Sequence, residues 1–443
     1  MTGVPTERDQ PVAMKYVSTR GAADGVSPSA AIERGIAPDG GLYVPERFPS
    51  LSLSDFGLRE GVAEIGRVLL SPFFEGDPLA DRVGELCDEA FDFPIPLRPL
   101  RGESAVLELF HGPTAAFKDV GARFLAAALA RLRADAAEPL TILVATSGDT
   151  GGAVAAAFHG RPGFRVVVLY PKGRVSPRQE KQLTGWGGNV HALAVRGDFD
   201  DCQRMVKEAF ADEDLRTALQ LSSANSINLG RLLPQMVYYA DASLRYLREH
   251  GSAPGFIVPS GNLGNAVACL WAQRAGLPIR EVALATNDNA TISEYFASGQ
   301  WQPRPTVETL ATAMDVGAPS NFERMQSLFG SWAQAHRHVR AIRVSDEAIR
   351  EEIRQGPERW GTDWDPHTAT AAAAFDQLPG DAWVLVSTAH PAKFEQVVEP
   401  LLGRTLPVPP ALGELLGHDA EAPEVAPTLD ALREVLGRLD SPA

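Results

Sequence analysis

The sequence predicts an α/β protein built around parallel β-sheet. From Ser104 onward, short apolar runs with the pattern of strands alternate with longer runs of helical periodicity, which is the signature of this fold class. Several of the strands run directly into loops rich in glycine and small polar residues that precede a helix. The 443 residues exceed one ordinary core, so we expect two or three domains, or one large α/β body with appendages.

The overall composition excludes several classes of protein. A formal net charge of -15 argues against binding to nucleic acid or to an anionic membrane, so an anionic substrate needs a local basic pocket. No apolar run approaches the roughly 18 residues of a membrane span, and the N-terminus lacks the apolar region of a signal peptide. The three cysteines, Cys87, Cys202 and Cys269, have no C-x-x-C or metal-ligand spacing. We therefore expect reduced core cysteines, no metal site and a cytoplasmic protein.

Residues 1–13 are predicted to be a disordered extension, and residues 14–103 a separate N-terminal unit. In this unit we expect a strand at 15–20, a helix starting near Ser27, and amphipathic helices at about 54–71 and 77–91, the last with Asp77 as N-cap and Pro78 at its first position. None of their side chains points to chemistry. The proline-rich run 93–100 predicts a rigid linker and therefore a domain boundary.

The first candidate for chemistry is Lys118. A strand pattern at 105–110 is followed by the turn signal Gly112-Pro113, and a helix pattern covers 117–133. Lys118 therefore falls in the first helical turn, where the helix dipole and the unpaired N–H groups disfavour an ammonium and lower the pKa of the lysine. A lysine that forms a Schiff base needs such a lowered pKa. The alternative is a solvated surface lysine, which is the usual state of this residue type.

A second strand, at 141–146, runs into the loop Ser147-Gly148-Asp149-Thr150-Gly151-Gly152 and then into a helix at 153–158. A loop in this position lies at the carboxyl edge of a parallel sheet, where α/β proteins bind ligands. Its small residues leave backbone N–H groups free to bind an anion at the start of the helix. The alternative is an ordinary tight turn, since any such turn favours Ser, Gly and Asp.

A third strand, at 256–259, leads into Ser260-Gly261-Asn262-Leu263-Gly264 and a helix at 265–276. The two glycines allow close backbone approach, Ser260 and Asn262 add side-chain donors, and the helix N-terminus favours an anion. This loop is therefore predicted to bind a phosphate group. It has neither the Gly-Lys-Ser/Thr ending of a Walker A loop nor a G-x-G-x-x-G fingerprint, so nucleoside triphosphates and NAD are disfavoured.

The segment 223–231 is dense in small polar residues and precedes a helix pattern at 232–246. Arg231 lies about a turn and a half beyond Asn225 and Ser226, and the three side chains together would form a clamp for a phosphate or carboxylate. The alternative is helix capping by the small residues plus an exposed arginine.

A further strand, at 383–388, runs into Ala389-His390-Pro391-Ala392-Lys393-Phe394. One candidate Schiff-base lysine, one phosphate-binding loop and two more anion-binding loops, gathered at a single sheet edge, fit a pyridoxal phosphate enzyme. The cofactor accounts for the lysine and one loop, and the remaining loops indicate an amino acid substrate with two anionic ends. In such enzymes the cofactor is the electron sink, and the protein supplies placement and proton transfer.

Seven separated motifs, all in one order, resemble those of the threonine synthases, a family of fold type II (tryptophan synthase β-like) pyridoxal phosphate enzymes. They are HGPTAAFKD at 111–119, TSGDTG at 146–151, SANSIN at 223–228, PSGNLG at 259–264, AMDV at 313–316, DPHTA at 365–369 and TAHPAKF at 388–394. The match runs from about Lys15 to the C-terminal tail. It implies two parallel-sheet α/β domains, at 104–221 and 222–443, with the active site between them, and a threonine-synthase-specific N-terminal subdomain at 14–103.

The resemblance implies the conversion of O-phospho-L-homoserine and water to L-threonine and phosphate, by γ-elimination and then β-addition of water, with pyridoxal 5'-phosphate as cofactor. Lys118 is implied to hold the cofactor as a Schiff base and, once released, to move protons at Cα, Cβ and Cγ of the substrate. The implied cofactor contacts are Asp149 near the O3′ hydroxyl, Ser260, Gly261, Asn262, Leu263 and Gly264 at the phosphate, and Thr388 at the pyridine nitrogen. The implied substrate contacts are Thr146, Ser147 and Thr150 at the α-carboxylate, and Asn225, Ser226 and Arg231, with help from Asn262, at the phosphate.

Other functions remain open at this point. A different reaction on the same scaffold is a dehydratase, a β-replacement, or a phospho-lyase for another phosphorylated amino compound, of which only the last needs the Arg231 clamp. If the chain were a non-enzymatic homologue used for binding, we would expect the Schiff-base lysine to be lost, whereas Lys118 is present. Asp149 stands where related enzymes usually have Asn, and its protonation state is open. The expected partner is the small-molecule substrate, and the chain is expected to act as a monomer or homodimer. His111 is left without a role.

Overall fold

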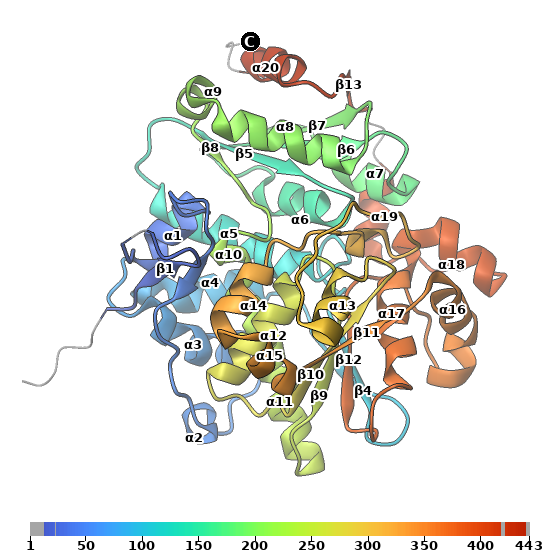
Figure 1. Ribbon diagram of the computed structural model, residues 1–443. Coiled ribbons are helices and arrows are strands. Elements are labelled where there is room, and N and C mark those ends of the chain that lie inside the picture. The colour runs from blue at the N-terminus through green and yellow to red at the C-terminus, as the bar shows by residue number, and fades with distance from the viewer. Residues whose placement is uncertain (1–12, 23, 418–420, 440–443) are drawn as a thin grey trace, which may run out of the picture.

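The computed structural model describes residues 13–22, 24–417 and 421–439 (Figure 1). The predicted disordered extension lies outside the described residues except for Ala13. The N-terminal unit contains an antiparallel strand pair, β1 (Tyr16–Ser18) and β2 (Tyr43–Pro45), with the helices α1 (Pro28–Arg34), α2 (Leu53–Phe56), α3 (Val62–Leu70) and α4 (Val83–Ala90). Ser27 caps α1 as predicted, because its side chain accepts a hydrogen bond from the backbone N–H of Ala30.

Two helices of this unit are shorter than predicted. The run 54–71 is divided between α2 and α3, because Gly57 and Gly61 have φ angles of 55° and 90°, which interrupt a helix. α4 begins further along the chain than expected, and Asp77 is not its N-cap. The Asp77 carboxylate instead accepts hydrogen bonds from the backbone N–H and the hydroxyl of Ser29, at 2.9 and 2.5 Å. This contact ties α1 to the segment before α4.

The proline-rich run 93–100 is not a linker. Its residues Leu97–Pro99 form β3, the edge strand of a six-stranded sheet, antiparallel to β4 (Ala105–Glu108). Proline is tolerated there because one side of an edge strand makes no ladder hydrogen bonds. The prediction was wrong because an edge strand that contains prolines has the same composition as a rigid linker.

The six-stranded sheet has the strand order β11-β10-β9-β12-β4-β3, and all neighbours except β3 and β4 are parallel. Its other strands are β9 (Gly255–Pro259), β10 (Glu281–Thr286), β11 (Val339–Arg343) and β12 (Trp383–Ser387). Successive side chains of β4 enter different hydrophobic clusters: Ala105 and Leu107 belong to one, and Val106 to another. Both faces of the sheet are therefore buried, as the continuously apolar strands predict.

The second sheet has five parallel strands in the order β13-β7-β6-β5-β8. They are β5 (Leu140–Ala145), β6 (Phe164–Pro171), β7 (Val190–Val195), β8 (Leu221–Ser222) and β13 (Glu424–Val425). In Figure 1 this sheet lies above the six-stranded one, and the N-terminal unit lies to one side.

Helices cover both sheets and connect their strands. Those outside the N-terminal unit are α5 (Lys118–Leu132), α6 (Asp149–Phe158), α7 (Pro177–Thr184), α8 (Phe199–Ala211), α9 (Glu213–Ala218), α10 (Leu229–Leu232), α11 (Gln235–His250), α12 (Gly264–Arg274), α13 (Thr291–Ser298), α14 (Phe322–Phe329), α15 (Trp332–His338), α16 (Asp346–Trp360), α17 (Pro366–Phe375), α18 (Glu395–Leu402), α19 (Pro410–Leu416) and α20 (Leu429–Leu439). Short 3-10 helices occur at η1 (Ser71–Phe74), η2 (Ala80–Arg82), η3 (Thr312–Met314) and η4 (Pro391–Phe394). Within the described ranges, no helix is long and apolar enough to cross a membrane.

The two sheets do not divide the chain at the predicted boundaries. β4 belongs to the segment 104–221 but pairs with β12 of the segment 222–443, whereas β13 of the later segment pairs with β7 of the earlier one. Each sheet is therefore completed by a strand from the other part of the chain. α5, which follows β4, packs against α6, which follows β5, and this contact joins the two sheets.

Candidate active site

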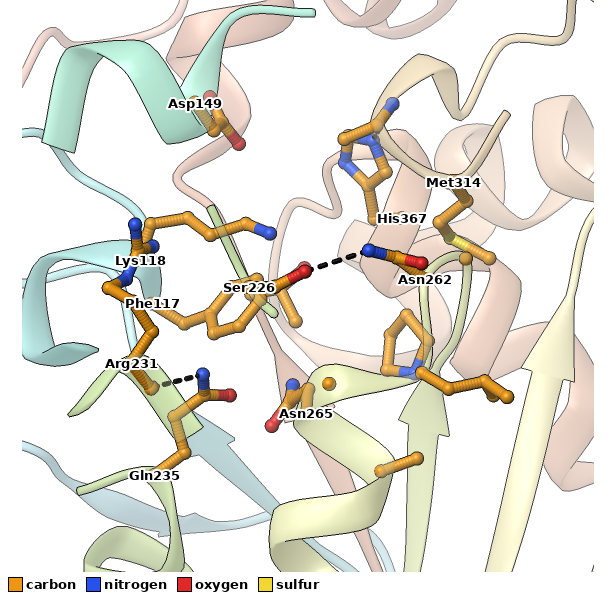
Figure 2. Close-up of a pocket in the computed structure, with 17 residues that line it drawn as sticks. Phe117, Lys118, Asp149, Ser226, Arg231, Gln235, Asn262, Asn265, Met314 and His367 are labelled. Carbon is orange, nitrogen blue, oxygen red and sulfur yellow. Dashed lines mark hydrogen bonds between the residues drawn. The ribbon is translucent and has the colours of Figure 1, made fainter. Parts of the chain in front are cut away.

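A pocket lies where loops from both sheets converge (Figure 2). Its walls come from the segments that follow β4, β9, β10 and β12 of the six-stranded sheet and β5 and β8 of the five-stranded sheet, and from α17. The strand patterns pointed to one sheet edge, whereas the resemblance implied a site between two sheets, which is the arrangement found. Of the predicted site residues, those that line the pocket are Lys118, Asp149, Ser226, Arg231, Gly261, Asn262, Leu263, Gly264 and Thr388. Those that do not line it are Thr146, Ser147, Thr150, Asn225 and Ser260.

Lys118 is the first residue of α5, as predicted. The loop before it is attached to the end of β12, since Ala116 forms a β-bridge with Ala389 and the Phe117 N–H donates to the Thr388 carbonyl at 2.8 Å. Burial, and then the positive charge of Arg231, lower the pKa of Lys118 to about 8, against the opposing effect of Asp149. The sequence placed the lysine correctly, but its pKa is lowered chiefly by burial.

Asp149 opens α6 and reaches the pocket from the five-stranded sheet. Its carboxylate forms a buried ion pair with Lys393 at 2.8 Å and accepts a hydrogen bond from Gln179 at 3.0 Å. Burial opposes ionisation of Asp149, but the charge and hydrogen bond of Lys393, with the hydrogen bond from Gln179, outweigh it and hold the pKa of the carboxyl below its usual range. Asp149 is therefore a carboxylate in this structure, which answers the question that the sequence left open.

Lys393 lay within a quoted motif but received no role from the sequence. It is fully buried, and its ammonium donates to the Thr114 carbonyl at 2.7 Å as well as pairing with Asp149. The sequence contained no signal for this pair, because the two residues belong to different elements of different sheets. The ammonium joins the loop before Lys118 to the start of α6.

The loop after β9 is shaped to receive a group close to its backbone. A Cβ atom on Gly261 would lie 2.6 Å from the Cα of Met314, so only glycine fits there. Leu263 has a left-handed φ of 62° and is the N-cap residue of α12, whose first N–H groups are unpaired within the helix. Ser260 turns away, since its hydroxyl donates to the Val258 carbonyl at 2.9 Å. The backbone and the helix N-terminus, not the serine, therefore form this wall.

The segment before α10 faces the same pocket. Arg231 is 1% exposed, so the alternative of an exposed arginine is wrong. Its guanidinium donates to the Ala224 carbonyl, and its Nε has no partner among the described residues. Burial lowers the pKa of Arg231 to about 10, so it stays charged at neutral pH. The Asn262 amide donates to the Ser226 hydroxyl at 2.7 Å, which joins this segment to the loop after β9.

The loop at 146–151 supplies fewer pocket groups than predicted. The Thr146 hydroxyl accepts hydrogen bonds from the backbone N–H groups of Gly148 and Gly151, at 2.9 and 2.8 Å. It therefore fixes the loop that presents Asp149. Ser147 and Thr150 are half-buried beside the pocket, and their binding of a substrate carboxylate stays a prediction.

Several lining residues had no predicted role: Phe117, Gln235, Pro259, Asn265, Ala266, Ala313, Met314 and His367. His367 is 3% exposed, and its Nε2 accepts the backbone N–H of Ala313 at 3.1 Å. The proton therefore resides on Nδ1, which donates to Asp365 at 2.8 Å. His367 thus holds η3 against the pocket, and its place in the DPHTA motif was the only sequence signal for it.

These residues fit pyridoxal phosphate. Lys118 provides a buried amine, and no hydrogen bond to its Nζ is found within the part of the chain that the structure describes. The loop at Gly261 packs closely on the Met314 backbone, which only glycine allows, and it lines the pocket next to a helix N-terminus that favours phosphate. Arg231 Nε and Asn265 Nδ2 are buried donors without partners on the pocket lining. Such orphaned donors indicate an anionic ligand.

Comparisons with known proteins agree with this geometry. A family model described as "Pyridoxal-phosphate dependent enzyme" matches residues 93–389, and models described as "Threonine synthase N terminus" and "Threonine synthase, C-terminal" match 15–91 and 368–436. The threonine synthase of Serratia marcescens is 42% identical over 94% of this chain and 97% of its own length.

Solved structures give the same result. The crystal structure of threonine synthase from Escherichia coli superposes with a TM-score of 0.89 at 39% identity, covering 96% of this chain and 100% of that one. The structure of threonine synthase from Brucella melitensis, described as bound to PLP, has a TM-score of 0.89 at 36% identity and covers 96% of this chain and 99% of that one.

Proposed function

This chain belongs to the threonine synthase family of pyridoxal-phosphate-dependent enzymes, and from that premise we propose that its pocket converts O-phospho-L-homoserine and water to L-threonine and phosphate. It is a carbon–oxygen lyase of threonine biosynthesis, with pyridoxal 5'-phosphate as its cofactor. The observation that carries the proposal is the buried Lys118 amine, which lies beside a phosphate-binding loop and a second group of anion-binding residues.

When bound, pyridoxal phosphate supplies an electron sink for negative charge that develops on the substrate carbons. Lys118 holds this group through its ε-amine. Its free amine would take up and return protons at Cα, Cβ and Cγ of the substrate. A pKa of about 8 suits this role, because both protonation states are then accessible near neutral pH.

The remaining contacts of the cofactor follow from the walls of the pocket. Gly261, Asn262, Leu263 and Gly264 hold its phosphate at the start of α12, and Ser260 supports that loop from the strand side. Asp149, which pairs with Lys393, would hold the O3′ hydroxyl. Thr388 would lie at the pyridine nitrogen, where a hydroxyl, unlike a carboxylate, does not force protonation, so the group would act there as a moderate electron sink.

The substrate is held by its two anionic ends. Ser226 and Arg231, with Asn262 and the neighbouring Asn225, bind the phosphate of O-phospho-L-homoserine. Thr146, Ser147 and Thr150 form the loop that binds the α-carboxylate, with Thr146 acting through the backbone that it orders. The distal phosphate site separates this activity from dehydratase and β-replacement reactions, whose substrates have no such group.

The direct test is incubation of the PLP-loaded protein with O-phospho-L-homoserine, with both phosphate and threonine measured. We expect equal amounts of the two products. Phosphate release with 2-oxobutyrate and no threonine would assign the protein to the phospho-lyases instead. A purified protein that shows no visible cofactor absorption, unchanged by borohydride, would favour a binding role without catalysis.

We also propose a monomeric or homodimeric cytoplasmic protein whose partner is the small substrate, without nucleic acid or membrane. Cys87, Cys202 and Cys269 are all free and buried, which fits a reducing compartment. Burial raises the pKa of Cys87 and Cys202 to about 12, so neither is a reactive thiolate. Light scattering of the purified protein decides between the two oligomeric states.

A further inference from the structure

Arg324 is a buried cation next to the pocket that the mechanism above does not use. It lies on α14, beside the N-terminal unit (Figure 1), and its side chain is completely buried. Its guanidinium donates hydrogen bonds to the Tyr43 carbonyl at 3.0 Å, the Ser226 carbonyl at 3.3 Å, the Ile227 carbonyl at 2.7 Å and the Asn321 side-chain oxygen at 2.7 Å. All four acceptors are neutral.

Arg324 and Arg231 hold the same short loop. Arg231 donates to the carbonyl of Ala224, and Arg324 donates to the carbonyls of Ser226 and Ile227. The loop 224–227 is therefore fixed at both ends by guanidinium groups. Its residue Ser226 lines the pocket, whereas Arg324 does not. Arg324 can act on a bound ligand only through this loop and through its charge.

Neither guanidinium is neutralised by an ion pair within the described residues. The charge of Glu323 raises the pKa of Arg324, but this carboxylate forms its own ion pair with Arg20 at 2.8 Å. Burial lowers the pKa of Arg324 to about 9, which still leaves it charged at neutral pH. Asp119 acts on Arg231, and Glu323 on Arg324, only through their charge and not through a direct ion pair. Two buried positive charges without a direct ion pair are costly in a folded protein, and a bound anion offsets that cost.

The N-terminal unit supports this loop from behind. Arg324 binds the carbonyl of Tyr43 in β2, and the Asn228 side chain, at the end of the loop, donates to the Ile32 carbonyl of α1 at 2.9 Å. The unit therefore contributes to the position of Ser226 without lining the pocket. It does more than cover the site.

We propose that Arg324 is a positioning and specificity-determining residue for the phosphate of the substrate: it fixes the Ser226 loop and supplies a second buried positive charge that makes the site select a dianion. This inference rests on the proposed function, which places the substrate phosphate at Ser226 and Arg231. A phosphate monoester carries a charge of about -1.5 to -2 at neutral pH. Because the Coulomb energy scales with the product of the charges, a second cation favours a dianion over a monoanion.

The test compares the PLP-loaded protein with its variants Arg324→Met and Arg324→Lys. Binding of inorganic phosphate and of nitrate is measured at about pH 8, where phosphate is a dianion, from the change in cofactor absorption and from inhibition. For Arg324→Met we expect roughly tenfold weaker phosphate binding and a similar rise in KM for O-phospho-L-homoserine, with nitrate binding changed by less than about threefold. The fall in kcat is smaller than the rise in KM, and the affinity for PLP is kept. Arg324→Lys, which keeps the charge and loses the planar fork, lies between Arg324→Met and the unmodified protein.

Two results overturn the inference. One is unchanged phosphate binding in Arg324→Met. The other is an equal loss of phosphate, nitrate and PLP affinity, which indicates a purely structural role. If Arg324→Met does not fold, Glu323→Gln decides, because it removes the negative charge beside Arg324 at a partly exposed position. It should tighten phosphate binding about twofold, and no tightening refutes the charge effect. Phosphate binding is measured without turnover, so the two hypotheses can fail separately. If the phosphate-binding results are as expected but the protein forms no threonine, the proposed function is wrong and the role of Arg324 stands.

Discussion

Replacing Lys393 by methionine removes the charge that keeps Asp149 ionised. Lys393 is fully buried, and its ammonium contacts the Asp149 carboxylate at 2.8 Å and the Thr114 carbonyl at 2.7 Å. Methionine has a similar length and adapts to irregular space, so the packing changes little. The variant therefore isolates the loss of the charge.

The expected cost can be worked out from the contacts that remain. Breaking a buried ion pair by removing one partner costs about 3–5 kcal/mol, because the other charge stays buried without compensation. Asp149 keeps its hydrogen bond from Gln179 at 3.0 Å, and the Thr114 carbonyl keeps one from Gln182 at 3.0 Å. We therefore expect the lower end of that range, a loss of about 3 kcal/mol in the free energy of unfolding at neutral pH.

The loss depends on pH in a defined direction. In the unmodified protein the pKa of Asp149 is below its usual value, so its ionised form stabilises the fold above the usual carboxyl pKa, and this contribution is lost as the pH falls through the lowered value. Without Lys393, burial dominates and raises the pKa of Asp149 above the usual value. The destabilisation by Lys393→Met is then largest at alkaline pH and shrinks as the pH falls and Asp149 takes up a proton.

The assay is urea unfolding, followed by circular dichroism at about pH 5 and about pH 8, of the unmodified protein, Lys393→Met, Asp149→Asn and the double variant. The double variant is the matched control, since a neutral amide at position 149 needs no counter-charge. It should recover most of the stability that Lys393→Met loses at pH 8. An equal loss at both pH values, or a double variant no more stable than Lys393→Met, would refute the reasoning.

Three further predictions follow from the pocket. Lys118→Ala should abolish turnover and the fixation of the cofactor by borohydride, while the circular dichroism spectrum stays the same. In the unmodified apoprotein, the rate of PLP attachment should level off above about pH 8 instead of rising up to the ordinary lysine pKa near 10.4. Arg231→Ala should mainly raise KM for O-phospho-L-homoserine, by roughly tenfold or more in steady-state kinetics, and an unchanged KM would move the phosphate site elsewhere. Gly261→Ala should weaken PLP binding by at least about tenfold in an absorbance titration, because its Cβ would lie 2.6 Å from the Met314 Cα. Gly264→Ala is the control, since its Cβ meets nothing closer than 3.5 Å, and equal losses in the two variants would contradict the steric argument.

Local patterns located most of the chemistry. Strand and helix periodicity placed Lys118 in the first turn of α5 and Gly261 in the loop before α12, because these patterns depend on residues close together in the chain. Glycines with positive φ were not recognised as breaks between α2 and α3, and the edge strand β3 was taken for a linker. In these cases the local signal is weak, since loops, linkers and edge strands share a composition.

The sequence by itself determined the fold class and, through its motifs, the family, and it singled out Lys118 and the loop of Gly261, both of which line the pocket. The tertiary structure alone decided which charges meet: Lys393 with Asp149 across two sheets, and Arg324 with the loop that presents Ser226. It also shows that the site lies between two sheets, as the resemblance implied, and not at the single edge that the strand patterns indicated. The physical reason is that periodicity and turn chemistry act over a few residues, whereas ion pairs and shared walls depend on how whole elements pack, and no short segment contains that information.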